Sequence, residues 1–245
     1  MKLSFVIPAY NEEKYLGDCL KSVLKQTENS AFDTEVIVVN NASTDKTEEV
    51  AGNFAGVKIV NEKKKGLSAA RHAGYEASTG DLIANIDADV ILPDGWIEKV
   101  MKAFAENPNL TGFSGPYIYH DLSALTNVAV RLFYYFGYAG YIMNRFILNK
   151  GAMLQGGNFV VRRSALEKIG GYNHDFEFYG EDTDIARRLH EVGDVVFTFD
   201  LPMYTSGRRL AGEGIITMAA KYGINHFWTI AFKKPFTKQF IDIRK

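Results

Sequence analysis

Short runs of aliphatic residues alternate with helical patterns through the first half of the chain, and this alternation constrains the fold more than any other feature. One run, Val36–Val39, is apolar at every position, which is typical of a strand buried on both faces of a sheet. The expected strands span residues 3–7, 35–39, 57–60 and 82–86, and the expected helices span residues 15–24, 43–54, 67–77 and 93–107. Strands that alternate with helices of this length predict a mostly parallel, doubly wound α/β sheet.

The second half of the chain is less regular. Its longest expected helix covers residues 121–148 and is rich in aromatic side chains. The remaining expected elements are a strand at 158–161, a short helix at 164–169, an amphipathic helix at 182–192 and a strand at 195–199. Since no repeat or linker interrupts the pattern, we expect one continuous domain with two halves, residues 1–115 and a more elaborate half at 116–245.

The composition and charge exclude several classes of protein. The 245-residue chain has 28 Lys and Arg against 29 Asp and Glu, a net charge of −1, which excludes a nucleic-acid binder that works by bulk basicity. The single cysteine, Cys19, forms no intramolecular disulfide, which favours a reducing compartment. The longest apolar run, Leu132–Met143, has 12 residues where a membrane-spanning helix needs about 20, and no targeting segment follows Met1. We therefore expect a cytoplasmic protein.

Polar clusters follow three of the predicted strands. They are Pro8–Glu12, Asn40–Asp45 and Asp87–Asp89. Ligands of doubly wound sheets bind at the carboxyl ends of the strands, so we expect all three clusters to line one edge of the sheet.

The third cluster carries two carboxylates, Asp87 and Asp89, at the end of an apolar strand. Unpaired carboxylates repel each other, and a hard cation such as Mg²⁺ or Mn²⁺ relieves this repulsion with only one or two protein carboxylates and phosphate oxygens. The alternative is that one aspartate caps the helix near Pro93 while the other is solvated.

A second acidic cluster and a basic loop lie elsewhere in the chain. In Gly180–Asp184, a carboxylate is a candidate general base for a hydroxyl, but helix capping and the helix dipole explain these acids equally well. The loop Lys63–Arg71 combines cations with a helix start, which suits a diphosphate, although a solvated loop has the same composition. The chain has no dinucleotide-binding G-x-G-x-x-G, no P-loop and no G-x-S-x-G nucleophile motif.

Taken in order, these segments resemble the family 2 glycosyltransferases, which have the GT-A fold. The resemblance covers about residues 3–200 and depends on the order of the motifs. The matching segments are Phe5–Glu12, Val38–Asp45, Gly66–Arg71, Gly80–Asp89, Gly156–Asn158, Arg162–Ser164, Gly170–Tyr172 and Gly180–Asp184.

The resemblance implies inverting transfer of a sugar from a nucleotide-diphosphate-sugar donor to a hydroxyl acceptor, either a saccharide or a lipid-linked saccharide. It implies that Asp89 with Asp87 holds Mn²⁺ or Mg²⁺ on the diphosphate and that Asp182 is the general base. The residues implied in donor binding are Pro8, Ala9, Tyr10, Glu12, Asn41, Arg71 and Asp87. Those implied in acceptor binding are Gly157, Asn158 and Glu181. The halves 1–115 and 116–245 then become the nucleotide-sugar-binding and acceptor-binding halves.

Two departures from the family pattern refine this hypothesis. Asn40 and Asn41 occupy two positions of which the first is commonly Asp in the family. An amide that reads the edge of the donor's base modestly favours a uracil nucleotide, UDP, over guanine or thymine nucleotides. The Gln-x-x-Arg-Trp signature of processive synthases is absent, which favours transfer of a single sugar. Arg208 and Arg209 take the late position, where a contact with the diphosphate or an anionic acceptor and a surface role are both open.

Other interpretations stay open at this point. A sugar nucleotidyltransferase shares the α/β layer and metal aspartates, but its glycine-rich, arginine-containing loop is missing after the first strand. A nucleotide-sugar-binding module without catalysis is the non-enzymatic alternative. The stretch Tyr117–Tyr141 holds eight Phe or Tyr residues, and is either a core helix with an aromatic lid or an interfacial patch or lipid-acceptor groove. The basic tail Lys233–Lys245 would add peripheral attraction to an anionic membrane.

Overall fold

The structure, a computed structural model, describes residues 1–146, 153–176 and 179–237. The last two residues of the expected helix 121–148, and residues 238–245 of the basic tail, lie outside the described residues.

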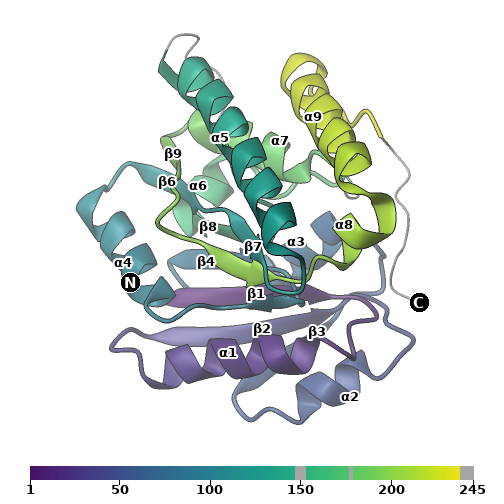
Figure 1. The fold of residues 1–245 in the computed structure, drawn as a ribbon. Coiled ribbons are helices and arrows are strands. Elements are labelled where there is room, and N and C mark those ends of the chain that lie inside the picture. Colours follow the sequence, from purple (N-terminus) through teal and green to yellow (C-terminus); the bar gives the residue numbers. More distant parts are fainter. Residues whose placement is uncertain (147–152, 177–178, 238–245) are drawn as a thin grey trace.

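A seven-stranded, mostly parallel sheet forms the centre of the molecule, with the strand order β3-β2-β1-β4-β8-β6-β9 (Figure 1). Its strands are β1 (Leu3–Ala9), β2 (Thr34–Asn40), β3 (Val57–Asn61), β4 (Leu82–Ile86), β6 (Leu110–Ser114), β8 (Asn158–Arg162) and β9 (Asp194–Phe197). β8 runs antiparallel to both of its neighbours, β4 and β6, while the other pairings are parallel. The predicted doubly wound α/β class is confirmed.

Helices cover both faces of this sheet, as the continuous apolar run in β2 predicts. One face packs against α1 (Leu16–Glu28), α2 (Thr47–Gly52) and α4 (Trp96–Glu106), with the β1 side chains of Leu3, Phe5 and Ile7 in the shared core. The other face packs against α3 (Leu67–Ala77), α6 (Arg163–Lys168) and α7 (Glu181–His190), with Val6 of β1 in that core. Successive residues of a strand point to opposite faces, so one strand contributes to both cores.

The second half of the chain adds a small sheet and three further helices. The small sheet has the order β5-β10-β7 and consists of β5 (Val90–Ile91), β7 (Tyr117–Tyr119) and β10 (Met203–Thr205). The helices are α5 (Ala124–Phe146), α8 (Arg208–Glu213) and α9 (Ile215–Phe232). Figure 1 shows α5 and α9 extending on the same side of the molecule, beyond β7 and α8.

Several elements differ from the sequence-based expectation. The helix expected from residue 43 begins at Thr47, because Ser43 and Thr44 hydrogen-bond to Asn11 of the neighbouring loop instead. β6 was not predicted, since its five residues include Gly112 and polar side chains. The strands of the small sheet are too short to show a periodic pattern, and α9 is mostly apolar without a clear polar face. The sequence pattern therefore does not predict these elements.

A pair of glycine-to-alanine variants tests how closely α3 packs on the sheet. A methyl group at Gly74 would overlap Cγ1 of Val6 and come within 3.0 Å of Cγ2 of Val39. We expect Gly74→Ala to destabilise the protein by about 1–3 kcal/mol, since overpacking outweighs a helix-propensity gain of about 1 kcal/mol. Gly17→Ala in α1 is the control, because its methyl group would meet Val50 at 3.8 Å. Urea unfolding measures both, and equal stabilities of the two variants would contradict the packing.

Candidate functional site

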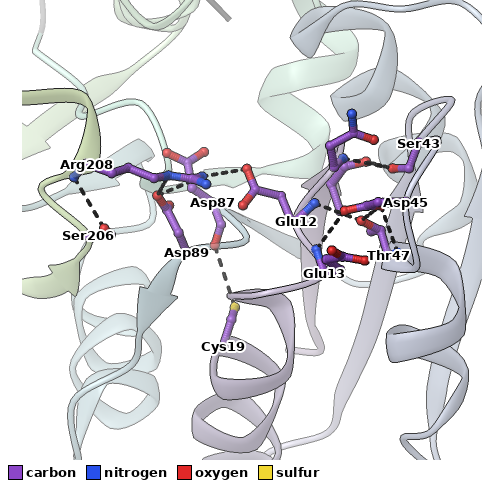
Figure 2. A network of polar contacts seen from close by, with 12 residues as sticks. Glu12, Glu13, Cys19, Ser43, Asp45, Thr47, Asp87, Asp89, Ser206 and Arg208 are labelled. Atoms are coloured by element: carbon purple, nitrogen blue, oxygen red, sulfur yellow. Dashed lines mark hydrogen bonds and ion pairs between the residues drawn. The ribbon is translucent and has the colours of Figure 1, made fainter. Parts of the chain in front are cut away.

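The three polar clusters meet at one edge of the sheet, as expected. The loop after β1 is tied to the loop after β2, because the backbone N–H of Asn11 donates to Ser43 Oγ at 3.1 Å. The backbone N–H of Glu12 donates to Thr47 Oγ1 at 2.8 Å (Figure 2). Asn11 and Ala42 both have φ in the left-handed region, at 52° and 57°. Non-glycine residues with this backbone are strained, and such strain is concentrated at functional sites.

Arg208 links two of these clusters through their carboxylates (Figure 2). Its Nη2 lies 2.6 Å from Glu12 Oε1 and 3.1 Å from Asp89 Oδ2. Its guanidinium also lies over the ring of Tyr15, with Cζ 4.4 Å from the ring centroid. The side chain of Arg208 therefore lies among the predicted site residues and not on the outer surface. Arg209 instead pairs with Glu213 at 3.1 Å.

The electrostatics of this cluster call for a cation. Burial raises the pKa of Asp89 to about 6, Arg208 opposes this rise, and the neighbouring Asp87 adds to it. The side chains of Glu12 and Asp89 are only 6% and 14% exposed. Carboxylates held this far from water are stable as anions only beside positive charge.

Asp87 and Asp89 fit the donor set of a hard divalent cation. Both present carboxylate oxygens at the end of β4, close enough for the charge of Asp87 to raise the pKa of Asp89. Within the described ranges, no group of three or more His, Cys, Asp or Glu side chains is arranged to hold a metal ion. The two aspartates would therefore supply one or two ligands, and the remaining positions would fall to phosphate oxygens and water, as is usual for Mg²⁺.

Two glycines bring Asp87 close to the acidic start of α7. A Cβ atom at Gly157, which has φ of 80°, would overlap the carboxyl group of Asp87, and a Cβ atom at Gly156 would lie 3.4 Å from Asp182 Oδ2. Tyr117 Oη lies 2.9 Å from Asp87 Oδ2 and 2.8 Å from the Gly156 carbonyl oxygen. Burial and the charge of Asp87 raise the pKa of Tyr117, so the phenol stays protonated and donates. Asp87 and Asp182 thus approach the same dipeptide.

Arg71 is buried between the two acidic clusters. Its side chain is 1% exposed, its Nη1 bonds to Glu181 Oε2, and its Nη2 lies 3.7 Å from Asp87 Oδ1. Burial raises the pKa of Glu181 to about 7, and Arg71 opposes this rise. The structure therefore places Glu181, predicted to bind the acceptor, in a buried ion pair, and places Arg71, predicted to bind the donor, where it orients Asp87.

Asp182, the predicted general base, lies in the first turn of α7 and is half-buried. Its Oδ1 accepts a hydrogen bond from its neighbour, the backbone N–H of Thr183, at 2.7 Å. Thr183 Oγ1 lies 3.2 Å from His226 Nδ1 on α9, and burial lowers the pKa of His226. A neutral imidazole and a carboxylate therefore lie together near the start of α7.

Two predicted site residues use their amides inside the protein. Asn41 Nδ2 donates to the carbonyl oxygens of Glu62 and Lys64, and its Oδ1 accepts from the N–H of Gly66. Asn158, which has no exposed surface, donates to two backbone carbonyls at 2.9 Å and accepts from Trp96 Nε1. Both amide hydrogens of Asn41 are therefore used inside the protein, and Asn158 shapes its surroundings by positioning the chain.

The other predicted donor residues lie at the end of β1 and in the loop that follows it. Pro8 and Ala9 are the last residues of β1, and the Ala9 carbonyl accepts from the N–H of Asn41 at 2.8 Å. Tyr10 Oη accepts from Lys65 Nζ at 2.9 Å, so the basic loop reaches the β1 loop. A small cavity of about 120 Å³ lies beside this basic loop. It is lined by Lys64, Lys65, Gly66, Ser68, Ala69, His174 and Phe176.

Sequence reasoning missed Tyr117 and left Arg208 undecided. Tyr117 belongs to a three-residue strand, β7, and no local sequence pattern predicts that this strand pairs with β10. The sequence signal for Arg208 was its position late in the chain, at the point where this sequence departs from the family pattern. Cys19 also lies beneath the site, with its Sγ 3.6 Å from the Asp87 carbonyl oxygen, and burial raises its thiol pKa.

The aromatic stretch forms a helix with one packed face, in agreement with the core-helix interpretation, and one exposed face. One face of α5 packs on β9 and the loop after it, with Tyr134 stacked on Phe197 at 6.0 Å between ring centroids. The opposite face is exposed, and Leu125 and Phe136 are 80% and 78% exposed. In the part of the chain that the structure covers, no helix is both long enough and apolar enough to cross a bilayer.

Comparisons with known proteins agree with this geometry. The family model of glycosyl transferase family 2 matches residues 4–170, and that of the N-terminal domain of galactosyltransferase matches residues 146–208. The probable glycosyltransferase YdaM of Bacillus subtilis is 28% identical over 208 residues, which are 78% of this chain and 47% of that protein. The chain spans less than half the length of the first curated relatives that it matches.

Solved structures of similar fold are glycosyltransferases of the GT-A type. Glucosyl-3-phosphoglycerate synthase from Mycobacterium tuberculosis, in complex with Mn²⁺, UDP and phosphoglyceric acid, has a TM-score of 0.67 at 20% identity and covers 98% of this chain and 83% of its own. The mannosyltransferase PcManGT from Pyrobaculum calidifontis, with GDP-Man and Mn²⁺, has a TM-score of 0.65 at 19% identity and covers 83% of this chain and 56% of its own. These likenesses confirm the GT-A fold, and because the family model spans more than half of the sequence, the chain belongs to glycosyl transferase family 2.

Proposed function

We propose that the chain transfers a single sugar, with inversion, from a nucleotide-diphosphate-sugar donor to a hydroxyl acceptor, with Asp182 as the general base. The observation that carries this proposal is the approach of Asp87 and Asp182 to the same dipeptide, Gly156–Gly157. A displacement at a sugar carbon needs the leaving diphosphate on one side and a deprotonating carboxylate on the other. The two acidic clusters meet that requirement.

The donor would lie along the edge of the sheet formed by the loops after β1, β2 and β4. Asp89 with Asp87 would hold Mn²⁺ or Mg²⁺, and the bound ion would neutralise charge on the leaving diphosphate. Two structural neighbours are described with Mn²⁺, one with UDP and the other with GDP-Man. UDP remains the favoured donor nucleotide of this proposal, although the amide of Asn41 that suggested it is used internally.

Asp182 would take the proton of the acceptor hydroxyl. The freed oxygen would bond to the anomeric carbon while the bond from that carbon to the diphosphate breaks, and the electron pair leaves with the nucleoside diphosphate. Attack from the side opposite the diphosphate inverts the anomeric centre. Gly157 keeps the space beside Asp87 free of a side chain.

The two halves of the chain would divide this work. Residues 1–115 carry the three donor-side loops, and residues 116–245 carry Gly157 and Asp182. Arg208 crosses this division, since it belongs to the second half and contacts Glu12 and Asp89 in the first. The proximity of Asp87 and Asp182 favours a transferase over a binding module without catalysis, because donor binding alone does not require the acid of α7.

Replacement of the base separates chemistry from donor binding. We expect Asp182→Asn to lower release of nucleoside diphosphate from the donor by about 100-fold or more, which is the usual contribution of a general base. Calorimetric titration with UDP, GDP and dTDP in the presence of Mn²⁺ should show unchanged binding of one nucleotide. Glu191→Gln, an acid-to-amide change at the other end of α7, is the matched control with normal turnover.

Two results would contradict this proposal in different ways. Turnover of Asp182→Asn at the normal rate would remove Asp182 as the base. A folded protein that binds none of the three nucleotides would remove the donor site.

We also propose that α5 and α9 touch an anionic membrane surface, at the inner face of the membrane if the chain acts in the cytoplasm. Both helices expose apolar side chains, among them Phe136 and Trp228. The segments 122–146 and 214–237 contain no Asp or Glu, whereas Lys233 and Lys234 are exposed at the end of α9. Exposed aromatic and aliphatic side chains beside basic residues match the chemistry of an anionic lipid interface.

Co-sedimentation with lipid vesicles tests this contact. We expect the protein to bind vesicles that contain phosphatidylglycerol more strongly than vesicles of phosphatidylcholine alone, since anionic lipid attracts the lysines. Phe136→Ser and Trp228→Ser should each weaken binding several-fold, whereas Phe32→Ser, a similar loss of an exposed aromatic far from α5 and α9, should not. Binding that is absent, or equally affected by all three variants, would contradict the contact.

A further inference from the structure

The position of Arg208 suggests a role beyond a static ion pair. We infer that Arg208 is an exchangeable counter-cation, which neutralises Glu12 and Asp89 in the empty site and transfers to the donor diphosphate when a divalent cation binds Asp89. The inference rests on the proposed function, because it takes Asp89 as a metal ligand.

The contacts of Arg208 are those of a cation that neutralises the carboxylates in place of a metal ion. Its Nε and Nη2 both lie 3.1 Å from Asp89 Oδ2, and its Nη2 lies 2.6 Å from Glu12 Oε1. One guanidinium thus bridges two largely buried carboxylates that come from loops 77 positions apart in the sequence. Arg208 thus occupies Oδ2 of Asp89 and places a positive charge next to any metal ion that binds this carboxylate.

Charge makes Arg208 and a divalent cation compete for Asp89. In the empty site, removing Arg208 would leave Glu12 and Asp89 next to Asp87 without a compensating cation, which is costly for buried acids. With a divalent cation on Asp89, the guanidinium would face a like charge and lose its oxygen. A donor diphosphate brings two or more negative charges, so it offers Arg208 a new partner at the moment its old one is taken.

The local fold permits this exchange. Arg208 is the first residue of α8, a six-residue helix with no buried residue, between Gly207 and Gly214. The segment before the helix is anchored, because Asp121 accepts hydrogen bonds from Ser206 Oγ and from the N–H of Gly207. The start of α8 is held as well, because the backbone N–H of Arg208 donates to Ser206 Oγ at 3.3 Å and Leu210 packs against the aromatic core. The exchange therefore needs movement of the Arg208 side chain alone, which is 21% exposed.

The exchange couples two binding equilibria. A divalent cation alone must displace Arg208 and therefore binds weakly, whereas a cation together with a diphosphate binds with mutual enhancement. By linkage, each ligand raises the affinity of the other by the same factor. A purely structural Arg208 would add nothing to the coupling that the cation and the diphosphate have through their direct contact.

Arg208→Gln tests the exchange, with Arg209→Gln as the matched change on the same helix. Mn²⁺ binding without nucleotide is followed by the paramagnetic resonance signal of free Mn²⁺. We expect Arg208→Gln to bind Mn²⁺ about tenfold more tightly than the normal protein, because its competitor is gone. Inorganic pyrophosphate, titrated at saturating Mn²⁺, should bind about tenfold more weakly to this variant. Arg209→Gln should change neither constant, and thermal unfolding confirms that all three proteins are folded.

The outcomes distinguish this inference from the proposed function. Equal Mn²⁺ affinities in the three proteins would overturn the exchange while leaving Asp89 as a metal ligand. Tighter Mn²⁺ binding with unchanged pyrophosphate binding would overturn the transfer of Arg208 to the diphosphate. Absence of Mn²⁺ binding in all three, even with pyrophosphate, would overturn the exchange together with the metal part of the proposed function.

Discussion

The arrangement of the site depends on the ion pairs of the buried guanidinium of Arg71. Arg71 projects from α3 and reaches Glu181 at the start of α7 and Asp87 at the end of β4, so one side chain joins three elements. Its guanidinium also lies 5.0 Å from the ring centroid of Phe159 on β8. Without this charge, Asp87, Glu181 and Asp182 would repel one another, and the buried carboxylate of Glu181 would lack a partner. Arg71 therefore allows the acids of both halves to share one site.

Arg71 and Arg208 both neutralise carboxylates of the site, but they differ in how firmly the fold holds them. Arg71 is 1% exposed and is surrounded by the packed faces of α3, α7 and the sheet, so its pairing belongs to the fold. Arg208 is 21% exposed on a short helix without buried residues, so its pairing can be exchanged for another. A site that must bind a cation and an anion in turn gains from one fixed and one exchangeable positive charge.

The sequence predicts the edge of the sheet well and the use of individual side chains poorly. Parallel strands end at one edge, so the convergence of residues 8–12, 40–45 and 87–89 follows from topology and periodicity alone. The roles of Asn41 and Asn158 do not follow in this way, because their hydrogen-bond partners, such as the Lys64 carbonyl, lie in distant or irregular segments. The position of Arg208 depends on β10, a strand of three residues that carries no periodic signal. Predictions fail where a long-range contact, rather than a local pattern, decides the geometry.

β8, the reversed strand of the large sheet, explains how the proposed acceptor side reaches the proposed donor edge. β8 is antiparallel to β4, and its first residue, Asn158, pairs with Ile86, the last residue of β4. The segment before β8 must therefore arrive where β4 ends, which places Gly157 against Asp87. In a parallel pairing the same segment would enter at the opposite edge, far from both aspartates. The absence of side chains at Gly156 and Gly157 then lets Asp182 approach as well. A single change of strand direction thus brings Asp87 and Asp182 to one edge of the sheet, as the proposed transfer requires.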